Sequence, residues 1–457
     1  MNAEAKLSAF KAYDVRGRVP DQLNERTVQE IGRAYARVIK PEGAVAVGRD
    51  IRETSDAFAC ALIAGLNAEG CRTVDIGLCG TEMVYYAAGQ AGMGGGIMVT
   101  ASHNPSDYNG LKMVRSGARP ISSDSGLTEI EQETRRLLAG PASTLAVNPD
   151  LHRQESVLQP YVSLLLGMIN PAAIKPLHLV VNAGNGCAGP VFDALAAHLP
   201  IRVTRLCHEP DGTFPNDVPN PMLIEQQQFT ARAVIEHGAD LGLAWDGDFD
   251  RCFFFDETGQ FIEGYYLVGL LAEQLLKKAP GSTVIYDPRL TWNTVQLVEA
   301  FGGKPVISKC GHSFIKDKMR EQDAVYGGEM SAHHYFRDFF YCDSGMIPWL
   351  LMLEQLSESG AKFSQVVESC MREFPCSGEI NFTIKSAAEA LQRVRAFYEG
   401  SAVTISTLDG LTMEFAQWRF NLRSSNTEPV VRLNVESRGD KTLLAAKTAE
   451  LKELITA

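Results

Sequence analysis

Short apolar runs alternate with amphipathic helical patterns along most of this chain, and this alternation limits the fold more than any other feature. In the first part, Val28, Ile31, Tyr35 and Val38 recur at helical spacing, and the apolar run 44–48 follows them. Another helical pattern and two further apolar runs come before residue 101. Such alternation is typical of βα units around a parallel sheet that is buried on both faces. We therefore predict an α/β domain at the start of the chain.

The same pattern restarts at residue 156 and again at residue 264. After residue 375 the runs become shorter and alternate apolar with polar residues, which indicates a smaller α+β domain. We predict three tandem α/β domains with mixed, largely parallel sheets and a C-terminal α+β domain, arranged around a central cleft. The expected boundaries are 1–153, 154–256, 257–370 and 371–457.

The composition is that of an ordinary folded protein, with 45% hydrophobic and 21% charged residues. The 43 Lys and Arg face 55 Asp and Glu, and the resulting charge of −12 does not favour a nucleic-acid partner. The first residues lack the features of a secretory signal, and no apolar run reaches the ~18 residues of a spanning helix. The ten cysteines contain no Cys-x-x-Cys pair, and most lie in apolar runs, as Cys60 and Cys252 do. We expect buried reduced thiols and a cytoplasmic protein without membrane contact or an obligate protein partner.

The stretch GGGIMVTASHNPSDYNGLK, residues 94–112, holds the first candidate site. Ser102 directly follows a strand-like run, and ligands of parallel α/β sheets bind outside the carboxyl ends of the strands. A serine hydroxyl is a weak nucleophile unless a base or positioned cations assist it, and His103 and Lys112 lie close in sequence. A polar turn is the plainer alternative, because Asn104 precedes a proline and Asn tolerates turn conformations.

The second candidate is a loop in which Asp246, Asp248 and Asp250 alternate after a strand-like run. Carboxylates packed this closely repel one another unless a cation neutralises them, and oxygen ligands suit Mg²⁺ or Ca²⁺. Arg251 beside them would suit a phosphate bridged to the metal. The spacing also resembles an EF-hand loop, but Arg251 stands where that loop needs glycine, and strands are expected on both sides. An acidic surface turn without metal is the other alternative.

Two later loops carry mixed donors and acceptors. Glu329, Ser331 and His333 share a short loop after a strand-like run, a mixture suited to vicinal hydroxyl groups. A run near the end of the chain offers guanidinium, hydroxyl and amide groups suited to a phosphate. Its members are Arg423, Ser424, Ser425, Asn426 and Thr427. An ordinary polar loop and a hairpin turn before a proline are the respective alternatives.

Other basic residues lie near the start of the chain. Tyr13 and Arg16 belong to a non-helical segment, where Arg16 would contact a phosphate or pair with a carboxylate. Arg49 and Arg52 precede a helical pattern, and we expect them to be solvated or ion-paired at the start of that helix.

Taken together, the four loops resemble those of the α-D-phosphohexomutase superfamily. TASHNP resembles its phosphoserine loop, DGDFDR its metal loop, GEMSAHH its sugar-binding loop and RSSNTEP its phosphate-binding loop, in the family's order and over nearly the whole chain. Three further stretches, FKAYDVRG, YDPRLTWNT and YGGEMSAHHYFRDFFYCDSGMIPWL, are similar to the bacterial phosphomannomutases that feed GDP-mannose synthesis. The resemblance implies an isomerase that acts on small hexose phosphates. It would interconvert mannose 6-phosphate and mannose 1-phosphate through a phosphoserine and mannose 1,6-bisphosphate, with Mg²⁺ as cofactor and a hexose 1,6-bisphosphate as activator.

The resemblance also implies roles for individual residues. Ser102 would carry the phosphoryl group and would hold Mg²⁺ together with Asp246, Asp248 and Asp250. Glu329 and Ser331 would bind the sugar O3 and O4, with His333 nearby. The phosphate that is not transferred would be bound by Arg423, Ser425, Asn426 and Thr427. The cleft would be lined, without an assignment of acid and base, by Tyr13, Arg16, His103, Lys112, Arg251 and His312.

Three other functions stay open from the residues alone. A phosphoglucomutase or a dual-specificity enzyme would use the same loops, because mannose and glucose differ only at C2. A metal-dependent phosphatase would also pass through a phosphoserine but would release inorganic phosphate. A Ca²⁺-binding module would need only the aspartate loop.

Overall fold

The computed structural model describes residues 7–142, 144–424 and 430–457. The chain divides into two compact units. The first comprises the residues up to Phe261 together with Asp338–Gly360, and the second comprises Ile262–Arg337 and Ala361–Ala457. The chain therefore passes between the units three times. In the described part of the chain, no helix is both long and apolar enough to cross a membrane.

The first sheet of the first unit has the strand order β1-β5-β4-β2-β3-β7, with β6 beside β5. Strands β4, β2, β3 and β7 run parallel, whereas β1 and β5 are antiparallel to their neighbours. The strands are β1 (Val15–Arg18), β2 (Ala44–Arg49), β3 (Thr73–Leu78), β4 (Met93–Val99), β5 (Tyr108–Arg115), β6 (Arg119–Pro120) and β7 (His152–Gln154). The helices are α2 (Glu25–Ile39), α3 (Ser55–Ala68), α4 (Thr81–Gly89) and α5 (Thr128–Leu138), with short turns η1 (Ser116–Ala118) and η2 (Ser123–Leu127).

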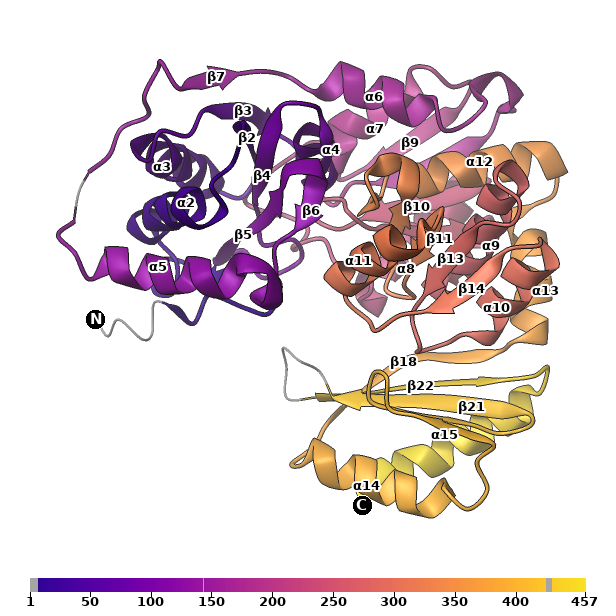
Figure 1. The fold of residues 1–457 in the computed structure, drawn as a ribbon. Helices are drawn as coiled ribbons and strands as arrows, with labels where there is room; N and C mark the ends of the chain where they lie inside the picture. The colour runs from indigo at the N-terminus through magenta and orange to yellow at the C-terminus, as the bar shows by residue number, and fades with distance from the viewer. Residues whose placement is uncertain (1–6, 143, 425–429) are drawn as a thin grey trace. The chain divides into compact units, whose positions relative to one another are not determined.

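Alternation along the strands explains the layers around this sheet. Val45 and Val47 share a hydrophobic core with residues of α2, α3 and α5. Figure 1 shows these helices beside the sheet. On the opposite face of the sheet, Gly48 of β2 and Gly96 of β4 face Val84 of α4. Both faces are therefore covered, as predicted for a parallel sheet.

The second sheet of this unit contains β11-β10-β8-β9, in which β10, β8 and β9 are parallel and β11 is antiparallel. Its strands are β8 (His178–Asn182), β9 (Arg202–Leu206), β10 (Leu241–Trp245) and β11 (Cys252–Asp256), and β12 (Phe261–Ile262) lies at the junction of the units. The other elements are α6 (Leu158–Leu166), η3 (Pro171–Ala173), α7 (Ala188–Ala196), α8 (Ile224–His237), η4 (Arg337–Phe339), β17 (Cys342–Asp343) and α12 (Ile347–Ser359). Phe192 of α7 packs between Trp245 and Trp349 of α12, with ring centroids 5.8 and 4.9 Å away. The late segment that carries α12 therefore completes the core of the first unit.

The second unit contains β14-β13-β15-β16 and, further along the chain, the antiparallel sheet β18-β22-β21-β20-β19. The first group comprises α9 (Gly264–Lys278), β13 (Thr283–Tyr286), α10 (Trp292–Ala300), β14 (Lys304–Ile307), α11 (His312–Gln322), β15 (Tyr326–Gly328), β16 (His334–Phe336) and α13 (Phe363–Glu373). The last group comprises β18 (Cys376–Thr383), α14 (Ala387–Tyr398), β19 (Thr404–Ser406), β20 (Leu411–Glu414), β21 (Trp418–Ser424), β22 (Val430–Ser437) and α15 (Lys441–Thr456).

A buried polar cluster joins the two groups of the second unit. Arg419 of β21 donates to Glu436 of β22 at 2.6 Å and to the carbonyl of Pro288 at 2.8 Å. Glu436 also accepts the hydroxyl of Tyr265 and the amide of Thr291, the latter at 2.8 Å. The last sheet is thereby attached to the loop before α10.

The predicted fold class, three α/β parts followed by an α+β part, is confirmed. The boundaries at 153, 256 and 370 stay predictions. All ten cysteines lie in the described residues, where none forms a disulfide and five are buried. Cys252 is buried, but Cys60 is exposed because its position on α3 faces away from the core despite its apolar neighbours.

Candidate functional site

The chain turns sharply after β4 and presents Ser102 in a left-handed backbone conformation, with φ of 51°. Non-glycine residues adopt this conformation uncommonly, and backbone strain of this kind clusters at active sites and ligand-binding turns. The amide of Ser102 donates to the hydroxyl of Thr100 at 2.9 Å. The hydroxyl of Ser102 donates to Oδ2 of Asp246 at 2.9 Å and lies 3.1 Å from Nδ1 of His103. The serine is therefore held against the aspartate loop.

The aspartate loop connects β10 to β11, so strands flank it and an EF-hand is excluded. Asp246, Asp248 and Asp250 are buried, and one oxygen from each lies within 4.8 Å of the other two. Among the described residues, Oδ1 of Asp246 and Oδ1 of Asp248 are buried without a hydrogen-bond partner. Buried carboxylate oxygens usually have partners, and hard oxygen ligands suit Mg²⁺. The donor set therefore fits a divalent cation, and it does not fit the alternative of an acidic surface turn.

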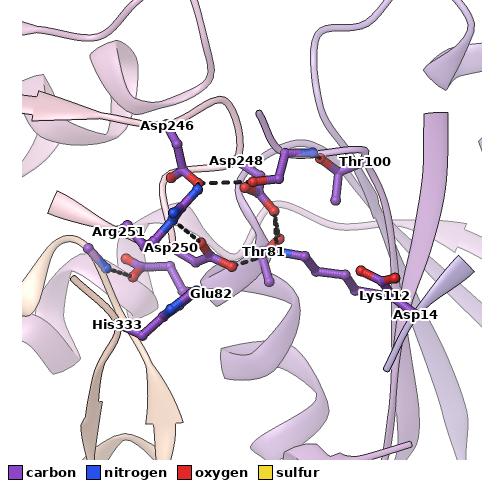
Figure 2. Close-up of polar contacts among 12 residues, drawn as sticks. Asp14, Thr81, Glu82, Thr100, Lys112, Asp246, Asp248, Asp250, Arg251 and His333 are labelled. Carbon is purple, nitrogen blue, oxygen red and sulfur yellow. Dashed lines mark hydrogen bonds and ion pairs between the residues drawn. The ribbon is translucent and has the colours of Figure 1, made fainter. Parts of the chain in front are cut away.

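Two cations neutralise part of this charge, as Figure 2 shows. Nζ of Lys112, on β5, donates to Asp248 at 2.6 Å and to Asp250 at 2.5 Å. The guanidinium of Arg251 donates to Oδ2 of Asp246 at 2.7 Å and also lies 2.7 Å from Nδ1 of His103. These cations hold the carboxylates together and leave a cluster with a residual negative charge.

The surroundings shift the pKa values of the central groups. Burial, opposed by Arg251, raises the pKa of the Asp246 carboxyl to about 6. Burial also has the largest effect on Lys112 and lowers its pKa, but Asp248 and Asp250 outweigh it, so the pKa of Lys112 is raised. Burial and then the charge of Arg251 lower the pKa of His103 well below its usual value. The two carboxylates therefore favour the charged form of Lys112, and burial and Arg251 favour the neutral form of His103.

Arg16 joins the same site from β1. Its guanidinium donates to Asp14 at 2.7 Å and to the side chain of Asn104 at 2.7 Å, beside Ser102. Tyr13 lies in the bend before β1 and is half-buried. Of the residues predicted for this part of the site, Ser102, His103, Lys112, Arg16 and Arg251 are thus brought together with the three aspartates.

The helix α4 supports the aspartate loop, which the sequence did not suggest. The amide of Thr81 donates to the carbonyl oxygen of Asp248 at 3.1 Å, and its hydroxyl donates to the carboxylate of the same residue. A Cβ atom at Gly80 would lie 2.2 Å from the ring of Phe249, so this contact requires glycine. Glu82, which follows Thr81 on α4, is buried and accepts the amide of Gly345 at 2.7 Å and the hydroxyl of Tyr161.

The sugar-loop residues lie together in the second unit. Glu329 accepts the hydroxyl of Tyr335 at 2.7 Å and the amide of Gly311 at 2.9 Å, directly before His312 at the start of α11. Ser331 lies 3.4 Å from Nδ1 of His333. Glu329, Ser331, His333 and His312 thus form one group at the end of β15 and the start of α11.

Arginines gather near this group. Arg289, Arg423 and Arg432 approach the carboxylate of Glu379 at 3.6, 3.4 and 3.4 Å. Arg289 also donates to Ser331 at 3.3 Å. Arg289 is also paired with Asp287 at 2.7 Å, but Arg423 and Arg432 share the single carboxylate of Glu379, and this pair of guanidinium groups suits a phosphate. Arg423 was predicted, and Ser424 ends β21, but Ser425, Asn426 and Thr427 lie outside the described residues.

Several residues of the site escaped the sequence reasoning. Arg289 follows the strand β13 in the stretch YDPRL, and its position after the end of a strand could have identified it as a site residue. Thr81 and Glu82 carried no such signal, because their partners lie far away in sequence. Arg49 is ion-paired with Asp75 as expected, but Arg52 is buried, and its contacts are described below.

Comparison with known proteins gives a consistent result over the whole chain. Residues 7–139, 159–259 and 263–374 match α/β/α domains I, II and III of the phosphoglucomutase/phosphomannomutase family. Residues 379–453 match the C-terminal domain of the same family.

Individual relatives agree with this match. A protein of Xanthomonas campestris named "Phosphohexose mutases" is 56% identical over 98% of this chain and 99% of its own length. A phosphomannomutase of Escherichia coli K12 is 52% identical over the same shares of the two chains. A phosphoglucomutase/phosphomannomutase family protein of Burkholderia thailandensis has a solved structure that superposes with a TM-score of 0.86 at 32% identity, covering 98% of this chain and 97% of that one.

Proposed function

This chain belongs to the phosphoglucomutase/phosphomannomutase family, and on that premise we propose that it is a phosphomannomutase, an isomerase that interconverts mannose 6-phosphate and mannose 1-phosphate. The observation that carries the proposal is Ser102, held in a strained turn with its hydroxyl against a buried aspartate cluster. Relatives named phosphomannomutase at about half identity support the choice of mannose.

The proposed reaction runs through a phosphoserine. The bond between phosphorus and Oγ of Ser102 breaks while a bond forms to a hydroxyl of the sugar monophosphate, whose proton ends on Oγ. The product is mannose 1,6-bisphosphate. In the second half the bisphosphate turns around and returns its other phosphoryl group to Ser102, so a hexose 1,6-bisphosphate also serves as activator of the unphosphorylated enzyme.

Neutralisation of charge supplies most of the catalysis in phosphoryl transfer. Arg251 and Lys112 lie beside the three aspartates and would balance the charge that moves during transfer. A Mg²⁺ ion held by Asp246, Asp248, Asp250 and the serine phosphate would neutralise the phosphoryl oxygens. His103 contacts Oγ of Ser102 and is placed to receive or return its proton.

The second unit would hold the sugar and the phosphate that is not transferred. Glu329 and Ser331 offer acceptors for the sugar hydroxyls, with His333 and His312 beside them. Arg423, together with Arg289 and Arg432, offers guanidinium groups for the phosphate, and we propose that Ser425, Asn426 and Thr427 add donors to it. Tyr13 and Arg16 would contact the substrate from the Ser102 side.

The experiment that tests this function is the intact mass of the purified protein with and without hexose 1,6-bisphosphate. We expect one added phosphate that disappears in Ser102→Ala, together with nearly all mutase activity. Ser106→Ala is the matched control, because it lies in the same loop but is exposed. Full activity in Ser102→Ala, or release of inorganic phosphate in place of isomerised sugar phosphate, would overturn the assignment.

A broader specificity is the second candidate, since one relative carries the name phosphohexose mutases. Comparison of kcat/KM for mannose 1-phosphate and glucose 1-phosphate tests it, and equal values would replace the mannose-specific proposal with a dual-specificity enzyme.

We further propose that the enzyme acts in the cytoplasm and that its product feeds GDP-mannose synthesis. None of the ten cysteines forms a disulfide in the described part of the chain, which supports a reducing compartment.

A further inference from the structure

Arg52 lies between β2 and α3 and is only 3% exposed. Its guanidinium donates to four carbonyl oxygens of the loop that carries Ser102. Nη1 donates to Pro105 at 2.7 Å and to Tyr108 at 2.9 Å. Nη2 donates to Ser102 at 2.9 Å and to Asn104 at 2.6 Å. One side chain therefore donates to four of the seven carbonyl oxygens of the turn 102–108.

Other contacts fix the guanidinium in this orientation. Asp50 forms an ion pair with Nε of Arg52 at 3.4 Å, and Asp50 is itself held by the hydroxyls of Ser55 and Thr100, each at 2.6 Å. The guanidinium also lies over the ring of Phe214, 5.4 Å from its centroid. Because Thr100 accepts the amide of Ser102, the same network reaches the serine from both sides.

The turn has a particular need for such support. Ser102 holds a positive φ, which costs energy in a residue with a Cβ atom and persists only where the surroundings impose it. The carbonyls of residues 102, 104, 105 and 108 converge on one point, and they would repel one another without a donor between them. A planar guanidinium with several N–H groups in fixed directions matches this arrangement, and a lysine does not.

We infer that Arg52 is a positioning residue for phosphoryl transfer: it holds the turn 102–108 in the shape that directs Oγ of Ser102 at the aspartate loop. The inference rests on the proposed function, in which Ser102 is the phosphorylated residue. Arg52 touches backbone carbonyls and would not contact the substrate.

Arg52→Lys is the first test, because it keeps the charge and the pairing with Asp50 but lacks the planar fork. We expect kcat to fall ~10²-fold, as for a reacting group misplaced by about 1 Å. KM for mannose 1-phosphate and the half-saturating Mg²⁺ concentration should stay within about twofold, because the loss is confined to the transition state. Arg49→Lys is the matched control, since Arg49 is a neighbouring arginine that is ion-paired with carboxylates outside the turn, and its kcat should not change.

Chemical rescue distinguishes positioning from a purely structural role. In Arg52→Ala, guanidinium ion at millimolar concentration should restore part of kcat, and it should restore nothing in Ser102→Ala. Hydrogen–deuterium exchange of the peptide amides of 102–108 should increase in both Arg52 variants and return toward wild type with guanidinium.

Two results would overturn the inference. One is an activity loss in Arg52→Lys that a smaller fraction of folded protein explains completely, so that kcat per folded molecule equals that of the wild type. The other is unchanged exchange in 102–108. An inactive wild-type protein would instead refute the proposed function, and the exchange measurement would still decide whether Arg52 holds the turn.

Discussion

A single methyl group added at Gly80 should damage the aspartate loop from the helix that supports it. In the structure, a Cβ atom at this position would lie 2.2, 2.4 and 2.5 Å from three ring carbons of Phe249, whereas ordinary contact begins at 3.4 Å. The shortfall is about 1.2 Å. Phe249 lies within the aspartate loop and is fully buried, so its ring has no free space to enter. Either α4 or the loop must therefore move by about that distance.

The expected size of the effect follows from this displacement. Overpacking of a buried site costs about 1–3 kcal/mol of stability. A shift of about 1 Å in groups that hold the reacting atoms costs ~10²-fold in rate. We therefore expect Gly80→Ala to lower kcat by roughly two orders of magnitude and to weaken Mg²⁺ binding, because Thr81 on the same helix turn donates to Asp248.

The assay is steady-state mutase activity at saturating substrate over a range of Mg²⁺ concentrations, with Mg²⁺ binding to the metal-depleted protein followed by calorimetry. Gly400→Ala is the control, because no atom lies within 4 Å of a Cβ there. If Gly80→Ala keeps the wild-type kcat, Tm and Mg²⁺ affinity, the packing of α4 against Phe249 does not position the loop, and the reasoning fails.

Three further predictions concern charge. Burial raises the pKa of Glu82 to about 8, so the folded protein keeps a proton that the unfolded chain loses near its ordinary pKa of 4.5. The free energy of unfolding should therefore fall as pH rises between these values, by up to about 1.4 kcal/mol per pH unit. The Tm of Glu82→Gln should lack this dependence on pH. Equal slopes of Tm against pH in the wild type and the variant would contradict the prediction. Arg419→Met should lower the free energy of unfolding in urea by about 3–5 kcal/mol, because it leaves Glu436 buried without its cation. The double variant that also carries Glu436→Gln should recover part of this loss. A loss below about 1 kcal/mol would mean that the pair is not buried in solution. Chelation of divalent cations should abolish turnover, and added Mg²⁺ should restore it. Asp248→Asn should weaken Mg²⁺ binding measured by calorimetry. Turnover that persists after chelation would exclude the metal role.

In the parts of the site that could be predicted from the sequence, the residues that indicate the chemistry lie close together in the chain. Ser102 and the aspartate loop each follow an apolar run that the residue pattern identifies as a strand, and strand ends are where such folds bind ligands. Three alternating carboxylates also carry their meaning in sequence, because their mutual repulsion requires a cation wherever the fold places them.

Residues whose partners are distant in sequence could not be predicted in this way. Arg52 precedes a helix, where a solvated or ion-paired residue was expected; it does pair with Asp50, but it is buried and its four carbonyl partners begin at Ser102. The antiparallel strand β5 was also missed, because the polar residues Asn109 and Lys112 interrupt its apolar pattern. In both cases a tertiary contact, absent from any local window, decides the environment.

The segment Asp338–Gly360 bears on how the protein is made. It is synthesised after Ile262–Arg337 of the second unit, but its helix α12 supplies Trp349 to the core of the first unit, against Phe192. On the ribosome, the first unit therefore cannot complete its core when Phe261 emerges, and it must wait until Gly360 has been added. Until then Phe192 and Trp245 lack their covering helix, which makes the growing chain a natural client for chaperones. A fragment that ends at Phe261 would carry the same defect permanently, so the order of synthesis and the order of folding differ in this chain.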